Sequence, residues 1–188
     1  MGLMEDRSTN ARNCISYEHH EVHAGSHFEV SYSVASIGAL TTPDDAITLS
    51  WKTPDSLKEM HIIFSAICEG GARVRFIEGK TGGGATPTGV LAAYNSNRRS
   101  DTTSLVRDVA GANVGNMSYD ATIFTGGTTI LDEYLAGVGP GVNDEASGSR
   151  GTQEWILERN TLYQLSIFDT GTVPATLKVT WYEHTPNN

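Results

Sequence analysis

Four of the chain's six histidines lie within nine positions, inside the segment YEHHEVHAGSH at residues 17–27. Neutral imidazoles next to carboxylates are the donors from which zinc and non-haem iron sites are built. Glu18 and Glu21 supply such carboxylates between the histidines. The first question is therefore whether this segment could bind a metal ion.

The spacing of these histidines argues against a metal site. A metal ion needs three or four ligand atoms that converge at about 2.0–2.3 Å. On a helix, His19 and His23 would lie one turn apart on one face. On a strand, they would be too far apart to share a metal ion. In the zinc-binding helix motif H-E-x-x-H, the second histidine follows the first by four residues. Here His23 follows His20 by only three. Gly25 and the strand that follows leave little room for a helix, so we expect no metal and no cofactor here.

A second polar cluster, YNSNRRSD at residues 94–101, stands out in an acidic chain. Asn95 and Asn97 predict a turn closed by side-chain hydrogen bonds to the backbone, with Arg98 and Arg99 in solvent. The alternative is that one arginine pairs with a carboxylate of a neighbouring subunit or binding partner.

Enzymatic motifs are not recognisable in the sequence. The acidic pairs Asp44–Asp45, Asp132–Glu133 and Asp144–Glu145 are adjacent, so on a strand the two carboxylates of each pair point to opposite faces. They therefore cannot face each other across a substrate, as glycoside hydrolysis requires. There is also no G-x-S-x-G nucleophile motif. We expect a protein that is not an enzyme.

The composition excludes several classes of partner. A length of 188 residues suits one domain with its own core, and the formal net charge of −9 argues against binding to nucleic acid or to an anionic membrane. No apolar stretch approaches the roughly 20 residues of a membrane span. The first residues also show no apolar signal segment, so we expect synthesis in a reducing cytoplasm.

Short apolar runs with a period of two predict roughly eight to ten β-strands, at the spacing of a sandwich or jelly roll. The run at 60–68 is apolar on both faces, which is typical of a strand at the centre of a sheet or under a subunit contact. We expect a tight hairpin at 158–163 and a long loop at 137–151. Residues 1–16 have no apolar pattern. The prediction is an all-β chain with an extended N-terminal arm (1–16) and a single, jelly-roll-like β-sandwich domain (17–188).

Several fragments, taken in order, resemble a family of small proteins encoded in tailed-bacteriophage genomes, often near the head genes. The fragments are HHEVHAGSHF (19–28), TPD (53–55), FIEG (76–79), YNSNRRS (94–100), EWILERNTLYQLSI (154–167) and LKVTWYEH (177–184). Members of this family resemble capsid decoration, or cement, proteins.

The resemblance implies a non-enzymatic β-sandwich protein on the outer surface of the phage capsid. It implies a homotrimer that binds the major capsid protein and stabilises the shell, with localisation in the virion after synthesis in the host bacterial cytoplasm. We expect attachment through the N-terminal region and further contacts through the polar cluster. The candidate contact residues are Tyr17, His19, His20, His23, His27, Asn95, Asn97, Arg98 and Arg99.

Two other functions remain open at this stage. A jelly-roll module of a phage head or tail fibre could bind a glycan receptor through Trp155, Tyr134 and the 137–151 loop. Trp51 and Trp181 are in phase with the apolar faces of their strands, so we expect both in the core. A metal-dependent hydrolase built on the four histidines is the third possibility.

Overall fold

The computed structural model describes most of the chain, and its secondary structure is almost entirely β. The described residues are 3–6, 11–14, 17–37, 47–69, 72–79, 87–119, 126–135, 143–147, 154–168 and 173–185. One helix, α1 (Tyr17–Ala24), lies among them. No helix in these ranges is long and apolar enough to cross a membrane.

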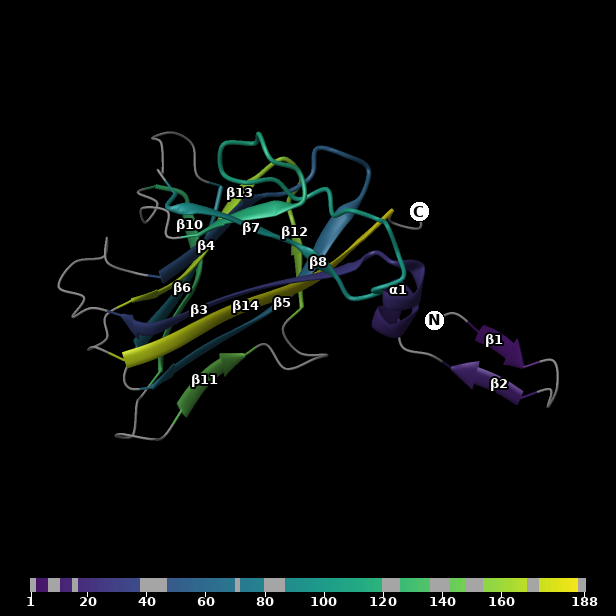
Figure 1. Cartoon of the computed structure of the whole chain (residues 1–188), viewed down its shortest axis with the longest axis horizontal. Helices are drawn as coiled ribbons and strands as arrows, with labels where there is room; N and C mark the ends of the chain where they lie inside the picture. Colours follow the sequence, from purple (N-terminus) through teal and green to yellow (C-terminus); the bar gives the residue numbers. More distant parts are fainter. Residues whose placement is uncertain are drawn as a thin grey trace.

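Two antiparallel sheets make up the body of the protein (Figure 1). The first sheet has the order β10 (Thr128–Leu135), β6 (Ala72–Glu78), β13 (Leu162–Phe168), β4 (Ile47–Lys52), β9 (Asn116–Tyr119), β7 (Gly89–Ala92). The second has the order β11 (Asn143–Ser147), β5 (Glu59–Glu69), β14 (Val173–His184), β3 (His27–Ile37), β8 (Tyr94–Asn95), and β12 (Trp155–Leu157) also pairs with β5.

The two sheets pack face to face and form a β-sandwich, as the sequence predicted. Alternate residues of each strand point inward, which is why the period-two runs become buried on one face. Phe64 of β5 meets Phe76 of β6 across the interface, with ring centroids 5.6 Å apart. Trp51 and Trp181 are fully buried in this core, which confirms that prediction.

The outer face of β5 differs from the expectation of a strand buried on both sides. Met60, Ile62 and Phe64 are buried on the inner face, whereas Ile63 and Ile67 on the outer face are only partly buried. β14 pairs with β5 along one edge, whereas the other edge of β5 pairs only with the short strands β11 and β12. β11 lies within the segment that the sequence predicted to be a loop.

The predicted hairpin at residues 158–163 is wrong. β12 pairs with β5 in one sheet, whereas β13 pairs with β4 and β6 in the other, so the turn crosses between the sheets. Thr53 stabilises this turn between the sheets. Its hydroxyl donates to the carbonyl of Glu158 (2.6 Å) and accepts from the amide of Thr161 (2.9 Å). The turn chemistry is local, but the choice of sheet depends on distant strands.

The N-terminal residues contain more structure than the sequence indicated. β1 (Leu3–Asp6) and β2 (Ala11–Cys14) pair as an antiparallel hairpin, where we expected an unpatterned arm. Figure 1 shows this hairpin beyond α1, apart from the two sheets. The helix itself corrects the expectation that Gly25 leaves little room for one. The eight residues before Gly25 form two turns, and the glycine ends them.

Candidate functional site

The end of α1 is fixed by its own backbone. Gly25 has φ +75°, a left-handed conformation that favours glycine. Its amide donates to the carbonyl of Val22 (3.1 Å), and the amide of Ser26 donates to the carbonyl of Glu21 (3.0 Å). This pair of bonds is the Schellman arrangement that closes many helices. It turns the chain from α1 directly into β3.

The polar cluster at residues 94–101 completes that helix end. The side-chain amide of Asn95 donates to the carbonyl of Gly25 (2.8 Å), and that of Asn97 donates to the carbonyl of His23 (3.1 Å). The carbonyl groups at a helix C-terminus lack intrahelical donors, so the two asparagines satisfy groups that would otherwise need water. The two segments that the sequence singled out separately therefore meet in space.

The same asparagines shape the cluster itself. The side-chain oxygen of Asn95 accepts from the amide of Asn97 (2.9 Å), and that of Asn97 accepts from the amide of Arg99 (3.1 Å). These successive side-chain turns are the structure that the sequence predicted for this segment. They fix the backbone from which Arg98 and Arg99 project.

Two buried side chains anchor the cluster and the residues that follow it. His27 is 7% exposed, and its Nδ1 lies 2.7 Å from the hydroxyl of Ser96. Glu183 of β14 is also buried, and its carboxylate accepts hydrogen bonds from the hydroxyl of Ser104 (2.5 Å) and the amide of Leu105 (3.0 Å). A buried carboxylate needs such donors. The cluster is thus tied to β3, and the residues that follow it are tied to β14.

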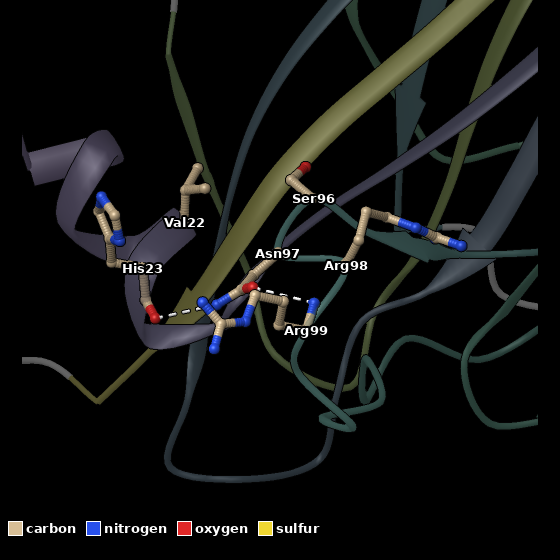
Figure 2. A pocket seen from close by; sticks show the side chains of 6 residues that line it. All are labelled: Val22, His23, Ser96, Asn97, Arg98 and Arg99. Atoms are coloured by element: carbon tan, nitrogen blue, oxygen red, sulfur yellow. Dashed lines mark hydrogen bonds between the residues drawn. The ribbon is translucent and has the colours of Figure 1, made fainter.

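An open pocket of about 700 Å³ lies between α1 and the cluster (Figure 2). Its lining residues are Val22, His23, Ser96, Asn97, Arg98 and Arg99. In Figure 2, Arg99 points toward the end of α1, where the negative end of the helix dipole favours a cation. Arg98 points away from the helix, and its guanidinium lies 5.8 Å from the ring centre of Tyr94. His23 and both arginines are exposed.

The pocket is suited to an anionic group. Within the described part of the chain, neither Arg98 nor Arg99 forms an ion pair with a carboxylate. Arginine presents a planar set of donors that matches a carboxylate, so an exposed pair can take up such a group from outside. The asparagine bonds hold the supporting backbone in place, which lowers the entropy lost on binding.

The candidate contact residues occupy different positions relative to the pocket. His23, Asn97, Arg98 and Arg99 line the pocket, whereas Asn95 and His27 support it from partly or fully buried positions. His20 is on α1 with its side chain 54% exposed, 3.5 Å from a carboxylate oxygen of Glu21. Tyr17 and His19 belong to α1, but their side chains lie outside those described.

Sequence reasoning missed a different group of histidines. Among the described side chains, the set whose donor atoms lie close enough to share a metal ion is Glu59, His61 and His184. None of these three belongs to the 17–27 segment. The sequence gives only a weak indication of this set. Glu59 and His61 lie two residues apart on one strand, but His184 is more than 120 positions away.

Among the residues proposed for glycan binding, Trp155 is the one whose side chain the structure describes. Trp155 packs against the core, with its ring centre 6.0 Å from that of Phe76 in an edge-on geometry. This packing makes it a poor stacking platform for a sugar. The side chain of Tyr134, and the 137–151 loop apart from β11, lie outside the described residues.

Comparison with known proteins gives no relative from which a function could be transferred. No family model, no curated protein and no solved structure matches the chain.

Proposed function

We propose that this chain is a non-enzymatic structural protein that decorates the outer surface of a tailed-phage capsid. It binds the major capsid protein through its N-terminal region, stabilises the shell and acts as a homotrimer. The observation that carries the proposal is the exposed arginine pair held at the junction between the N-terminal region and the β-sandwich. The ordered fragments that resemble phage decoration proteins point to the same role.

The junction has the properties of an attachment surface. Arg98 and Arg99 are exposed cations in a chain with a net charge of −9, and their charge complements an acidic patch on a partner. Their backbone is fastened to α1 by the side chains of Asn95 and Asn97. The hairpin β1–β2 lies beyond α1, apart from the two sheets, and adds contact area in this proposal (Figure 1).

A trimer strengthens this attachment without any new type of contact. When one subunit is bound, the second and third bind at a high effective concentration, so weak single contacts add up to a stable cap. The outer face of β5 and β12 supplies the subunit contact in this proposal. Ile63 and Ile67 are partly exposed there, and Ile156 is 64% exposed.

Deletion of residues 1–16 tests the attachment. The truncated protein retains α1 and the sandwich, so we expect an unchanged β-type circular dichroism spectrum. We also expect it to stay in the supernatant when it is sedimented with undecorated heads of the phage that encodes it, whereas the full chain sediments with them. Equal sedimentation of both proteins would remove the N-terminal region from the mechanism.

Light scattering coupled to gel filtration tests the oligomeric state. The full chain should elute with three times the mass of one chain, and Ile156→Asp should lower this mass because it places a charge in the apolar contact. A single-chain mass for the unaltered protein at micromolar concentration would contradict the trimer.

A further inference from the structure

The remaining two histidines, His61 and His184, meet on the outer face of the second sheet. β5 and β14 are antiparallel neighbours, with Glu59 directly opposite His184 and His61 directly opposite Tyr182. Residues two apart on a strand share a face, and directly opposite residues share it as well. The strand register therefore places all four side chains together, although the two histidines are 123 positions apart.

The neighbours of each ring favour one position for its proton. His61 Nδ1 is 2.8 Å from a carboxylate oxygen of Glu154, and His184 Nδ1 is 3.1 Å from the carbonyl oxygen of Thr185. Both oxygens can only accept, so each contact is a hydrogen bond when Nδ1 carries the hydrogen. The Glu154 oxygen also accepts from the hydroxyl of Tyr182, which holds the carboxylate in place.

This arrangement leaves an electrostatic conflict between the rings. With both protons on Nδ1, each Nε2 presents a lone pair, and the two Nε2 atoms lie 2.8 Å apart. Two lone pairs at that distance repel unless a positive centre lies between or beside them. That centre is either a proton shared by the two rings or a metal ion.

A third donor converges on the same point. A carboxylate oxygen of Glu59 lies 4.0 Å from His61 Nε2, and the donor atoms of Glu59, His61 and His184 all lie within 4.8 Å of one another. We propose that these three residues bind a divalent transition metal ion, Zn²⁺ being the best fit, through His61 Nε2, His184 Nε2 and the Glu59 carboxylate. A solvent molecule would take the fourth position.

The donor set and its surroundings suit zinc. Two imidazoles and one carboxylate are a common three-ligand set for this ion. A ligating histidine almost always donates its other ring N–H to a carboxylate or a backbone carbonyl, and Glu154 and Thr185 are placed to accept these bonds. Zn–N bonds of about 2.0–2.1 Å in a tetrahedron set two nitrogens roughly 3.3 Å apart. The rings need to separate by only about half an ångström.

The surroundings of His61 suit a fixed ligand. Its side chain is only 11% exposed, and its ring stacks on that of Tyr182 with ring centres 4.7 Å apart. The ring is therefore held in one orientation before a metal ion binds. The bound ion would join the start of β5 to the end of β14, which are already neighbours, so little order has to be gained on binding.

Calorimetric titration with Zn²⁺ tests the site. The full chain, purified without a polyhistidine tag or nickel resin and stripped with a chelator, should bind one Zn²⁺ per chain. His61→Gln and His184→Gln should weaken binding by about 100-fold or more, beyond the loss typical for an outer partner. His20→Gln and His23→Gln are the matched controls on α1 and should leave binding unchanged.

A second readout separates loss of ligand from loss of fold. Co²⁺ should give the intense visible absorption of a four-coordinate site in the unaltered chain and not in His184→Gln, which lies near the end of the last strand. Zn²⁺ should also raise the melting temperature of the unaltered chain only. Absence of binding, with one proton shared between His61 and His184 in ¹⁵N NMR spectra, would overturn the proposal. So would zinc binding that is lost in the α1 variants.

Discussion

The two histidine regions of this protein differ in how their side chains come together. In residues 19–27 the histidines are dense in the sequence, but the structure spreads them over a short helix, its end and the first residue of β3. In the β5–β14 pair they are far apart in the sequence, yet the strand register brings His61 and His184 to 2.8 Å. Density along the chain and convergence in space are separate properties.

The surroundings of the two regions differ as well. At the end of α1, the exposed cations Arg98 and Arg99 face solvent beside His23, which suits contact with an acidic partner. At the β5–β14 pair, carboxylates surround the rings, and Glu154 orients His61. One region is thus suited to anions and the other to a cation. Variants that separate these two properties test the comparison.

The largest effect is expected from reversing charge at the α1 region. Arg98→Glu with Arg99→Glu should reduce binding to capsid heads by about 100-fold, because like charges placed together at an interface cost several kcal/mol. Sedimentation with undecorated heads measures this loss. Arg107→Glu with Arg159→Glu makes the same change in net charge at other exposed positions and should bind normally. Equal losses in the two double variants would mean that only overall charge matters.

The next effect concerns the outer partner of the histidine pair. Glu154→Gln keeps the size of the side chain but weakens its acceptor for His61, so Zn²⁺ affinity should fall by about 10–100-fold. Capsid binding should not change. Glu158→Gln alters an exposed carboxylate of the neighbouring turn and should leave zinc affinity intact in the same calorimetric assay. An unchanged affinity in Glu154→Gln would show that Glu154 does not orient the ring.

A smaller effect is expected at the glycine that ends α1. Gly25 and Gly79 both have positive φ, so alanine at either position costs about 1–2 kcal/mol of unfolding free energy. A Cβ at Gly25 would also lie 2.7 Å from the Cβ of Ser100, whereas one at Gly79 meets nothing within 4 Å. Gly25→Ala should therefore lose about 1–2 kcal/mol more than Gly79→Ala in urea unfolding. Equal losses would contradict tight packing of the cluster against α1.

The smallest effect is expected at the ion pair between Arg73 and Asp132, which lies outside both histidine regions. The hydrogen bond from Arg73 lowers the pKa of Asp132, with Arg75 adding to the effect. The folded state therefore gains stability from the ionised carboxylate above pH 4 and loses it as pH falls through the lowered pKa. The gain is about 0.5–1 kcal/mol for a partly exposed pair. Asp132→Asn should therefore lower the free energy of unfolding by this amount at pH 7, and the two proteins should converge as pH falls below 4. Equal stability of the two proteins at pH 7 would contradict this assignment.

Much of the sandwich follows from the sequence because its physics is local. Alternation along a strand sets one face toward the core, so the burial of Trp51, Trp181 and Cys68 follows from their phase. The asparagine turns are equally local, since Asn95 and Asn97 bond to amides two residues ahead. The same reasoning located Arg98 and Arg99 in solvent.

Other features depend on contacts that no short stretch of sequence specifies. α1 has no apolar stripe, and its end is stabilised by Asn95 and Asn97 from about 70 residues away. The turn at 158–161 has the chemistry of a hairpin, but distant strands decide which sheet each arm joins. The meeting of His61 with His184 requires the register of β5 against β14, which sequence patterns do not set.

An electron cryo-microscopy reconstruction of phage heads incubated with the full chain tests the central claim most directly. The account predicts three-fold density on the outer surface of the shell, with the α1 end of each β-sandwich and the residues before it directed at the major capsid protein. Density with α1 directed away from the shell, or heads that remain bare while the protein binds elsewhere on the virion, would contradict it.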